Sequence, residues 1–164
     1  MKTSHEKIEA LKIFIIFFMN KTLLLFGTDT TPLVSILQKF KVVSMPELGF
    51  GNDEKNFETI STHLIKDDVL PVVVINCTES RLTTTLDYTL AKLKDVSDGV
   101  RHHKNVLVIF KSCPSKRKCP FPFEVLHDFF PTVTEDKILC VDYDEPPSCV
   151  KLCDTLSEIL NKIT

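Results

Sequence analysis

The feature that most constrains the fold is an alternation between short, continuous apolar runs and longer segments with helical periodicity. The runs lie at residues 22–26, 70–75, 105–110 and 137–141 and are rich in leucine, isoleucine and valine. Apolar runs of this kind are typical of strands that are buried on both faces of a sheet. A shorter run at 41–45, stopped by Pro46, predicts a further strand.

Between these runs, apolar residues recur every three or four positions, as in helices that pack on a sheet. The predicted helical faces are Leu33, Ile36, Leu37 and Phe40; Phe57, Ile60, Leu64 and Ile65; Leu82, Leu86, Leu90 and Leu93; and Val150, Cys153, Leu156, Ile159, Leu160 and Ile163. A short helix is also expected near residues 123–130. Alternating strands and helices predict an α/β fold with a doubly wound, mostly parallel sheet of five to six strands.

The chain length predicts one domain, since 164 residues lie within the usual range of about 100–200. We expect this domain to span residues 21–164, with residues 1–20 as an N-terminal extension that is disordered or packed on it. The apolar run at 13–19 is too short for a membrane span, which needs about 20 residues. A net charge of −2 gives no long-range attraction to nucleic acid or acidic membranes, so neither is an expected partner.

Ligands of parallel α/β sheets bind beyond the carboxyl ends of the strands, which directs attention to the loops at 27–31, 76–80, 111–118 and 142–147. The first loop reads Gly27, Thr28, Asp29, Thr30, Thr31. Thr30 or Thr31 is the expected N-cap of the helix that follows.

A phosphate-binding P-loop at this place needs G-x-x-x-x-G-K-[ST], with a lysine for the β- and γ-phosphates and a hydroxyl for magnesium. Aligned on Gly27, the second glycine is Pro32, the lysine is Leu33 and the hydroxyl is Val34. Asp29 also puts a carboxylate where phosphate charge would lie. The sequence therefore predicts a small-GTPase-like layout without a functional P-loop.

Other nucleotide and signalling folds share this alternation. A receiver domain needs an aspartate at the end of the middle strand, where this chain has Asn76. A flavin-phosphate loop stays open, because Thr28, Thr30 and Thr31 offer hydroxyls beside a helix N-terminus. A signalling domain of the TIR-like kind also stays open, with Glu79 as its candidate catalytic glutamate.

The third loop has no asparagine-lysine-x-aspartate to read a guanine base, and holds a basic cluster from Lys111 to Lys118 instead. A second basic stretch comprises Arg101, His102, His103 and Lys104. Either stretch is a candidate contact for an acidic partner or an ordinary solvated surface.

The cysteines and histidines predict neither a metal site nor a nucleophile. Cys77, Cys140 and Cys153 lie in apolar patterns and are expected to be buried free thiols. Cys113 and Cys119 do not have a common zinc-ligand spacing. No nucleophile turn such as G-x-S-x-G accompanies the histidines, and His127 is expected to be a packed or surface residue. No catalytic residue, cofactor or metal ligand is predicted.

Three stretches resemble the centromere protein M family, kinetochore subunits regarded as pseudo-GTPases. They are the opening strand with its turn Gly27, Thr28, Asp29; the strand 72–76 with the helix 82–93; and the strand 138–142 with the C-terminal helix. The resemblance covers roughly residues 21–163. Members of that family tend to continue past the last helix.

The resemblance implies a GTPase-like fold that neither binds nor hydrolyses GTP. It also implies a non-catalytic interaction subunit of the inner kinetochore, in the nucleus, held beside helical-repeat partners: centromere protein I with the H and K subunits. It carries over no binding residue. The apolar or aromatic candidates for a protein contact are Phe50, Tyr88, Phe121 and Tyr143.

Overall fold

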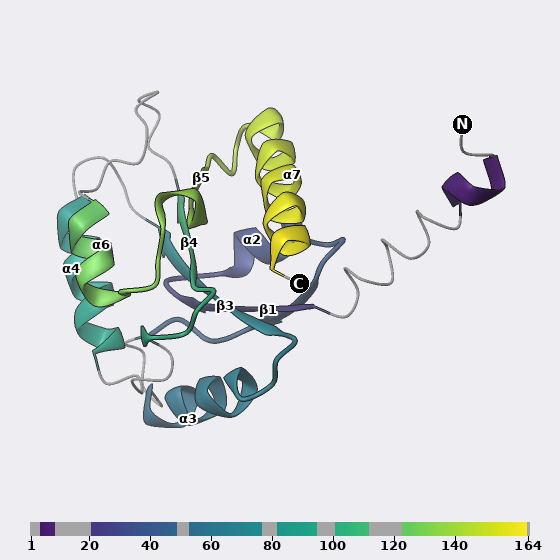
Figure 1. Cartoon of the computed structure of the whole chain (residues 1–164). Helices are drawn as coiled ribbons and strands as arrows, with labels where there is room; N and C mark the ends of the chain where they lie inside the picture. Colours follow the sequence, from purple (N-terminus) through teal and green to yellow (C-terminus); the bar gives the residue numbers. More distant parts are fainter. Residues whose placement is uncertain are drawn as a thin grey trace.

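The computed structural model describes residues 4–8, 21–48, 53–76, 82–94, 101–111 and 123–163, apart from the side chains at 82–87, 123 and 125. Within these residues, five strands form one sheet in the order β2-β1-β3-β4-β5, and every neighbouring pair is parallel (Figure 1). The strands are β1 (Thr22–Gly27), β2 (Lys41–Ser44), β3 (Val69–Asn76), β4 (Leu107–Lys111) and β5 (Ile138–Val141). The prediction of a doubly wound α/β fold is confirmed.

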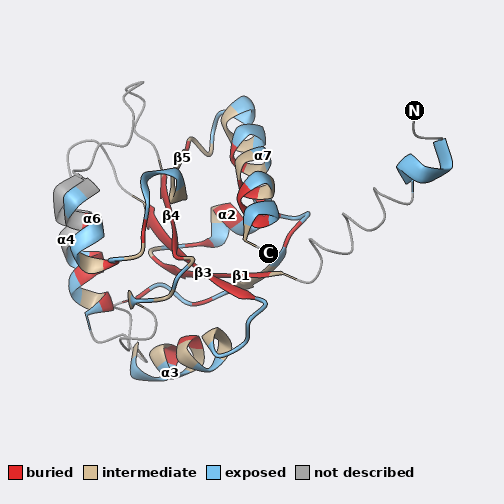
Figure 2. Ribbon diagram, in the orientation of Figure 1, coloured by how far each residue is buried: buried red, intermediate tan, exposed pale blue. Residues whose placement is uncertain are grey.

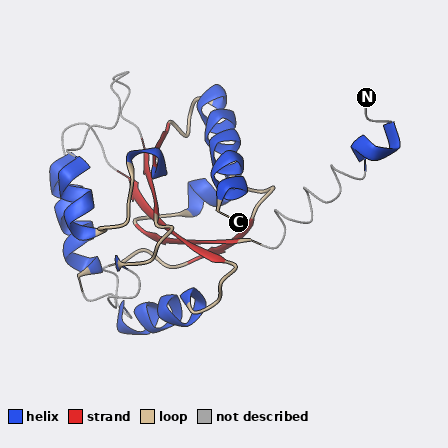
Figure 3. Cartoon of the chain, viewed as in Figure 1, coloured by secondary structure: helices blue, strands red, loops and turns tan. Residues whose placement is uncertain are grey.

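Helices cover both faces of this sheet (Figure 3). One face carries α2 and α7, and the other carries α3, α4 and α6, as the side chains that pack together show. The helices are α2 (Thr31–Ile36), α3 (Asp53–Leu64), α4 (Leu82–Leu93), α6 (Phe123–Phe129) and α7 (Pro146–Lys162), and a short 3-10 helix, η2 (Glu135–Lys137), leads into β5. Residues 4–8 form a separate short helical segment with exposed side chains.

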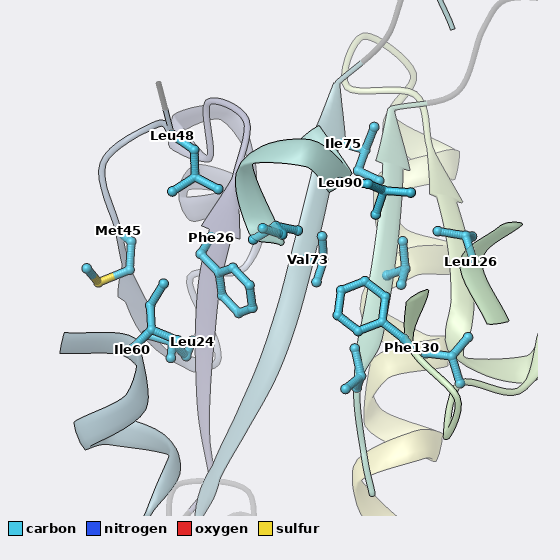
Figure 4. Close-up of a cluster of buried hydrophobic side chains, with 14 of the residues drawn as sticks. Leu24, Phe26, Met45, Leu48, Ile60, Val73, Ile75, Leu90, Leu126 and Phe130 are labelled. Carbon is cyan, nitrogen blue, oxygen red and sulfur yellow. The ribbon is translucent and has the colours of Figure 1, made fainter. Parts of the chain in front are cut away.

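The core is two apolar layers, one on each side of the sheet, and the strands supply the buried residues of both (Figure 2). Neighbouring residues along β1 point to opposite faces, so Leu24 joins one layer while Leu25 joins the other. In the layer beneath α3, α4 and α6, Phe26, Val73 and Phe130 lie among the clustered side chains (Figure 4). Burial on both faces explains why the central strands are continuous apolar runs.

Two of the predicted helical faces contain a residue that the structure exposes. Ile65 lies beyond the end of α3 and is 82% exposed. Val150 is 60% exposed, because the buried face of α7 runs through Leu152 and Leu156, and a helix turns about 100° per residue. The predictions for Ile65 and Val150 were wrong, and Leu152 was missed.

Several strand ends also differ from the prediction by one or two residues. β4 begins at Leu107 and not at 105, because the backbone amide of Asn105 donates to Nδ1 of His103 in the preceding turn. Lys137 belongs to η2 and not to β5. Met45 is buried but follows the last residue of β2. In the described part of the chain, none of the helices is long and apolar enough to cross a membrane.

Candidate functional site

The strand order places a topological switch point between β1 and β3. From β1 the chain crosses to β2 on one side, and from β3 it crosses to β4 and β5 on the other. The two crossovers leave the sheet in opposite directions, which opens a crevice beyond the carboxyl ends of β1 and β3 in folds of this kind. Gly27, Thr28 and Asn76 lie there.

Gly27 allows β1 to end directly against β3. Its φ of +127° is a conformation that other residues rarely adopt, and a Cβ atom added to it would lie 2.5 Å from the carbonyl oxygen of Val74. The next backbone amide, that of Thr28, donates to the same carbonyl at 2.9 Å. The glycine predicted as the start of the loop therefore serves a close backbone approach in this chain.

The side chain of Thr28 is a bridge between the ends of β1 and β3. Its hydroxyl donates to the carbonyl of Val74 at 2.9 Å and accepts from the backbone amide of Asn76 at 2.8 Å. The side-chain amide of Asn76 in turn donates to the backbone carbonyl of Asp29 at 2.6 Å. Polar groups at the switch point are thus bonded to one another.

Tyr143 extends this network to the loop that follows β5. Its hydroxyl donates to Oδ1 of Asn76 at 2.7 Å. Between these two residues β4 ends at Lys111, whose ammonium group lies 5.7 Å from the centre of the Tyr143 ring. The tyrosine was predicted only as a candidate protein contact, and the structure makes it a half-buried part of the strand-end network.

The N-cap residue of α2 is Thr30, one of the two threonines that the sequence predicted, and the carboxylate of the preceding residue, Asp29, bonds to the first turn. The carboxylate of Asp29 accepts the backbone amide of Thr31 at 3.0 Å, while the N-cap residue Thr30 makes no capping bond with its side chain. Hydrogen bonds from the hydroxyl and the amide of Thr31 lower the pKa of Asp29. The hydroxyl of Thr30 is buried and hydrogen-bonded to that of Ser44 at the end of β2.

Each residue aligned with the missing groups of a P-loop has an ordinary structural place. Pro32 lies in the first turn of α2. Leu33, in the position of the lysine, is fully buried in the layer formed with α7. Val34, in the position of the magnesium-binding hydroxyl, is partly exposed on α2. The helix that would present lysine to a phosphate presents leucine to the core.

The loop after β5 is fixed by its own short contacts. Ser148 Oγ accepts the backbone amide of Asp142 at 2.9 Å, and the carboxylate of Asp142 accepts the amide of Asp144 at 3.0 Å. Cys149 lies against this loop with its Sγ atom 3.5 Å from the carbonyl oxygen of Asp142. Burial, followed by the charge of Asp142, raises the pKa of the Cys149 thiol.

Cys140 and Cys153 are also free thiols. Both are half-buried, whereas the sequence predicted that they are buried. Burial is the main cause that raises the pKa of Cys153, whose Sγ atom lies 3.6 Å from the carbonyl oxygen of Ile36. Thiols with raised pKa values are mostly protonated near neutral pH and are therefore weak nucleophiles. In the part of the chain that the structure describes, no group of three or more His, Cys, Asp or Glu side chains could hold a metal ion.

Two other predicted candidates have described positions. Tyr88 is 52% exposed on α4, with the ammonium of Lys92 5.5 Å from its ring centre, so it stays a candidate for a protein contact. His127 is exposed on α6, and its Nδ1 atom lies 3.2 Å from the carbonyl oxygen of Val133.

Several other candidates lie outside the described residues. They are Phe50, Cys77, Glu79, Cys113, Cys119, Phe121 and the loop from 112 to 118.

The sequence indicated the strand ends as the place of a site, but not which side chains meet there. The sequence drew attention to Asn76 as the residue that ends a strand and to Tyr143 as a candidate protein contact. It gave no reason to single out Ser44, the partner of Thr30. Searches of this chain against family models, against curated proteins and against solved structures find no match.

Proposed function

We propose that this chain is a non-catalytic protein-interaction subunit of the inner kinetochore, with a GTPase-like fold that neither binds nor hydrolyses GTP. The observation that carries the proposal is the hydrogen-bond network across the switch point. Thr28 and Asn76 bond to each other there, and Tyr143 bonds to Asn76. Polar groups used in this way hold the fold together and leave few free donors for a phosphate.

Charge and shape at α2 support the same proposal. A triphosphate needs free backbone amides and a cation at the helix N-terminus. Here the amide of Thr31 donates to the carboxylate of Asp29, and Leu33 is buried where the lysine would be. Like charge would repel a phosphate placed beside Asp29. Binding GTP would require this N-terminus to be rebuilt.

The kinetochore assignment rests on the resemblance to the centromere protein M family. Its expected partners are helical-repeat subunits, centromere protein I with H and K, and its expected location is the centromere in the nucleus. The net charge of −2 supports contact with protein and not with nucleic acid.

A second candidate function is a small flavin- or nucleotide-binding enzyme. The strand order favours it, because proteins with this order can hold a flavin at the boundary of β1 and β3. To bind a flavin phosphate, the threonine hydroxyls of the loop after β1 would first have to break their present hydrogen bonds. Those of Thr28 and Thr30 bond to Val74 and Ser44, and that of Thr31 bonds to Asp29.

Affinity purification of the tagged chain from dividing cells, followed by mass spectrometry, tests both candidates. The matched control is Leu33→Asp, which buries a carboxylate in the core and identifies proteins that bind any unfolded chain. Recovery of the helical-repeat centromere subunits with the native chain only is the expected result. A yellow preparation, or a bound nucleotide without those subunits, would support the enzyme and end the kinetochore proposal.

A further inference from the structure

A basic groove lies at the amino ends of β4 and β5, whereas the switch point lies at the carboxyl ends of β1 and β3. The turn before β4, the helix η2 and the end of α7 enclose a hollow of about 270 Å³. Its lining includes three lysines, Lys104, Lys137 and Lys162, and two isoleucines, Ile159 and Ile163. The sequence singled out one part of this surface, the basic stretch that ends at Lys104.

Lysines outnumber acidic residues in the lining of the groove. The ammonium of Lys137 donates to two neutral oxygens, the carbonyl of Lys104 at 3.1 Å and Oδ1 of Asn105 at 3.4 Å. Within the residues that the structure describes, none of the three lysines forms an ion pair. The carboxylate of Asp136 lines the groove and accepts the hydroxyl of Thr134. The lining therefore holds three lysines and one aspartate, in a protein whose net charge is −2.

His103 lies beside this groove and responds to the same charge. Burial is the main cause that lowers its pKa, and the charges of Lys104 and Lys137 lower it further. Its ring accepts the backbone amide of Asn105, a residue of the lining, at 3.1 Å.

Two of the residues that line the groove are apolar. Ile159 is 7% exposed, and Ile163 is half-buried where α7 ends. A lining that combines apolar side chains with three lysines matches a peptide that has an aliphatic side chain flanked by carboxylates. Nucleic acid matches it less well, because none of the side chains that line the groove is an aromatic that could stack on a base.

We propose that this groove is a docking site for an acidic segment of a partner protein, with one aliphatic side chain seated on Ile159 and Ile163. The proposal rests on the proposed function in that it assigns a surface to a protein-interaction module. The groove lies at the amino ends of the strands, whereas the switch point lies at their carboxyl ends, so the two sites can be tested separately.

Titration of the ¹⁵N-labelled full chain with a synthetic peptide tests the docking site. The peptide carries a central leucine flanked by glutamates, and a second peptide has lysines in place of the glutamates. The acidic peptide is expected to shift the amide signals of Lys104, Asn105 and Lys162 saturably, and less at about 1 M salt, where the Debye length falls to about 3 Å. Equal shifts with the two peptides, or unchanged signals at the groove, would overturn the proposal.

Charge-removing variants make the test specific. Lys104→Gln with Lys162→Gln removes two exposed charges from the lining and is expected to weaken peptide binding about five- to tenfold. The matched control, Lys55→Gln with Lys151→Gln, removes two exposed charges from α3 and α7 away from the groove and should not change the affinity. Equal affinities of the two double variants would contradict the proposal, provided that both melt like the native chain.

The same variants separate this inference from the proposed function. Recovery of centromere subunits in equal amounts by the native chain and the Lys104→Gln, Lys162→Gln variant would overturn the docking site alone. Saturable peptide binding at the groove, without recovery of any centromere subunit, would support the docking site and overturn the kinetochore proposal.

Discussion

The hydroxyl of Tyr143 lies 2.7 Å from Oδ1 of Asn76 and donates to it, which ties the loop after β5 to the end of β3 across the end of β4. Asn76 also donates to the carbonyl of Asp29, so one side chain connects the carboxyl ends of three strands. The residues meet although 67 positions separate Tyr143 from Asn76 in the sequence. Such a chain of hydrogen bonds stabilises the edge of the sheet where related folds bind ligands.

Removal of the Tyr143 hydroxyl should show how much its hydrogen bond to Asn76 contributes to the stability of the fold. Tyr143→Phe keeps the ring near Lys111 but leaves Oδ1 of Asn76 without that donor. We expect the free energy of unfolding to fall by about 1 kcal/mol, measured by urea denaturation. Tyr88→Phe is the control, since Tyr88 is exposed on α4. Equal effects of the two substitutions would show that the Tyr143 bond contributes no stability.

Gly27→Ala should be among the most destabilising changes of a single methyl group in the described chain. The added Cβ would meet the Val74 carbonyl at 2.5 Å, and alanine at a φ of +127° is strained. We expect a loss of about 2–4 kcal/mol in the free energy of unfolding. Ser35→Ala, on the exposed side of α2, serves as the control. A Gly27→Ala variant as stable as the control would mean that β1 does not approach β3 so closely.

Two substitutions at Thr28 separate its hydroxyl from its shape. Thr28→Val preserves the shape but removes the partner of the Asn76 backbone amide, so we expect a loss of about 1–3 kcal/mol in unfolding free energy. Thr28→Ser keeps the hydroxyl and should lose less. The comparison is made by thermal and urea unfolding of the purified variants. A serine variant less stable than the valine variant would refute the bridging role.

His103 should make the fold less stable in mild acid. Its pKa is lowered below the ordinary 6.5 in the folded chain, so the unfolded chain binds more protons as the pH falls. The stability from the neutral ring is therefore complete above about pH 6.5 and is lost as the pH falls toward the folded pKa.

Unfolding free energies of His103→Asn, measured from pH 7.5 to 5, check this prediction. Asparagine offers an acceptor to the Asn105 amide but does not titrate, so the pH dependence should become flatter. His102→Asn, on an exposed neighbour, is the control. An unchanged pH profile in His103→Asn would exclude His103 as the titrating group.

Much of the fold follows from local sequence pattern. The continuous apolar runs predicted β1 and β3, because strands buried on both faces need apolar residues at every position. Strand ends were less certain, since they depend on hydrogen bonds such as that from the Asn105 amide to His103. The exposure of Val150 was missed because apolar spacing alone does not say which side of α7 meets α2 and the sheet.

The candidate site could be predicted only in outline. Strand ends are where ligands bind in such folds, and that rule directed attention to the loops that begin at Gly27 and Asn76, but not to the bond between Thr28 and Asn76. The partner of Asn76 is set by how the loop after β5 folds back over the sheet, which no local pattern encodes. Propensity suggested Thr30 or Thr31 as the N-cap of α2, and Thr30 holds that position. Propensity did not indicate that the Thr30 hydroxyl bonds to Ser44, so that the carboxylate of Asp29 accepts the Thr31 amide instead.

Isothermal titration of the purified chain with GTP and magnesium tests the central claim most directly. We predict no binding heat up to about 1 mM GTP, because the network of Thr28, Asn76 and Tyr143 occupies the switch point and Leu33 replaces the phosphate-binding lysine. Saturable binding with a Kd below about 1 mM would contradict it, with or without release of phosphate.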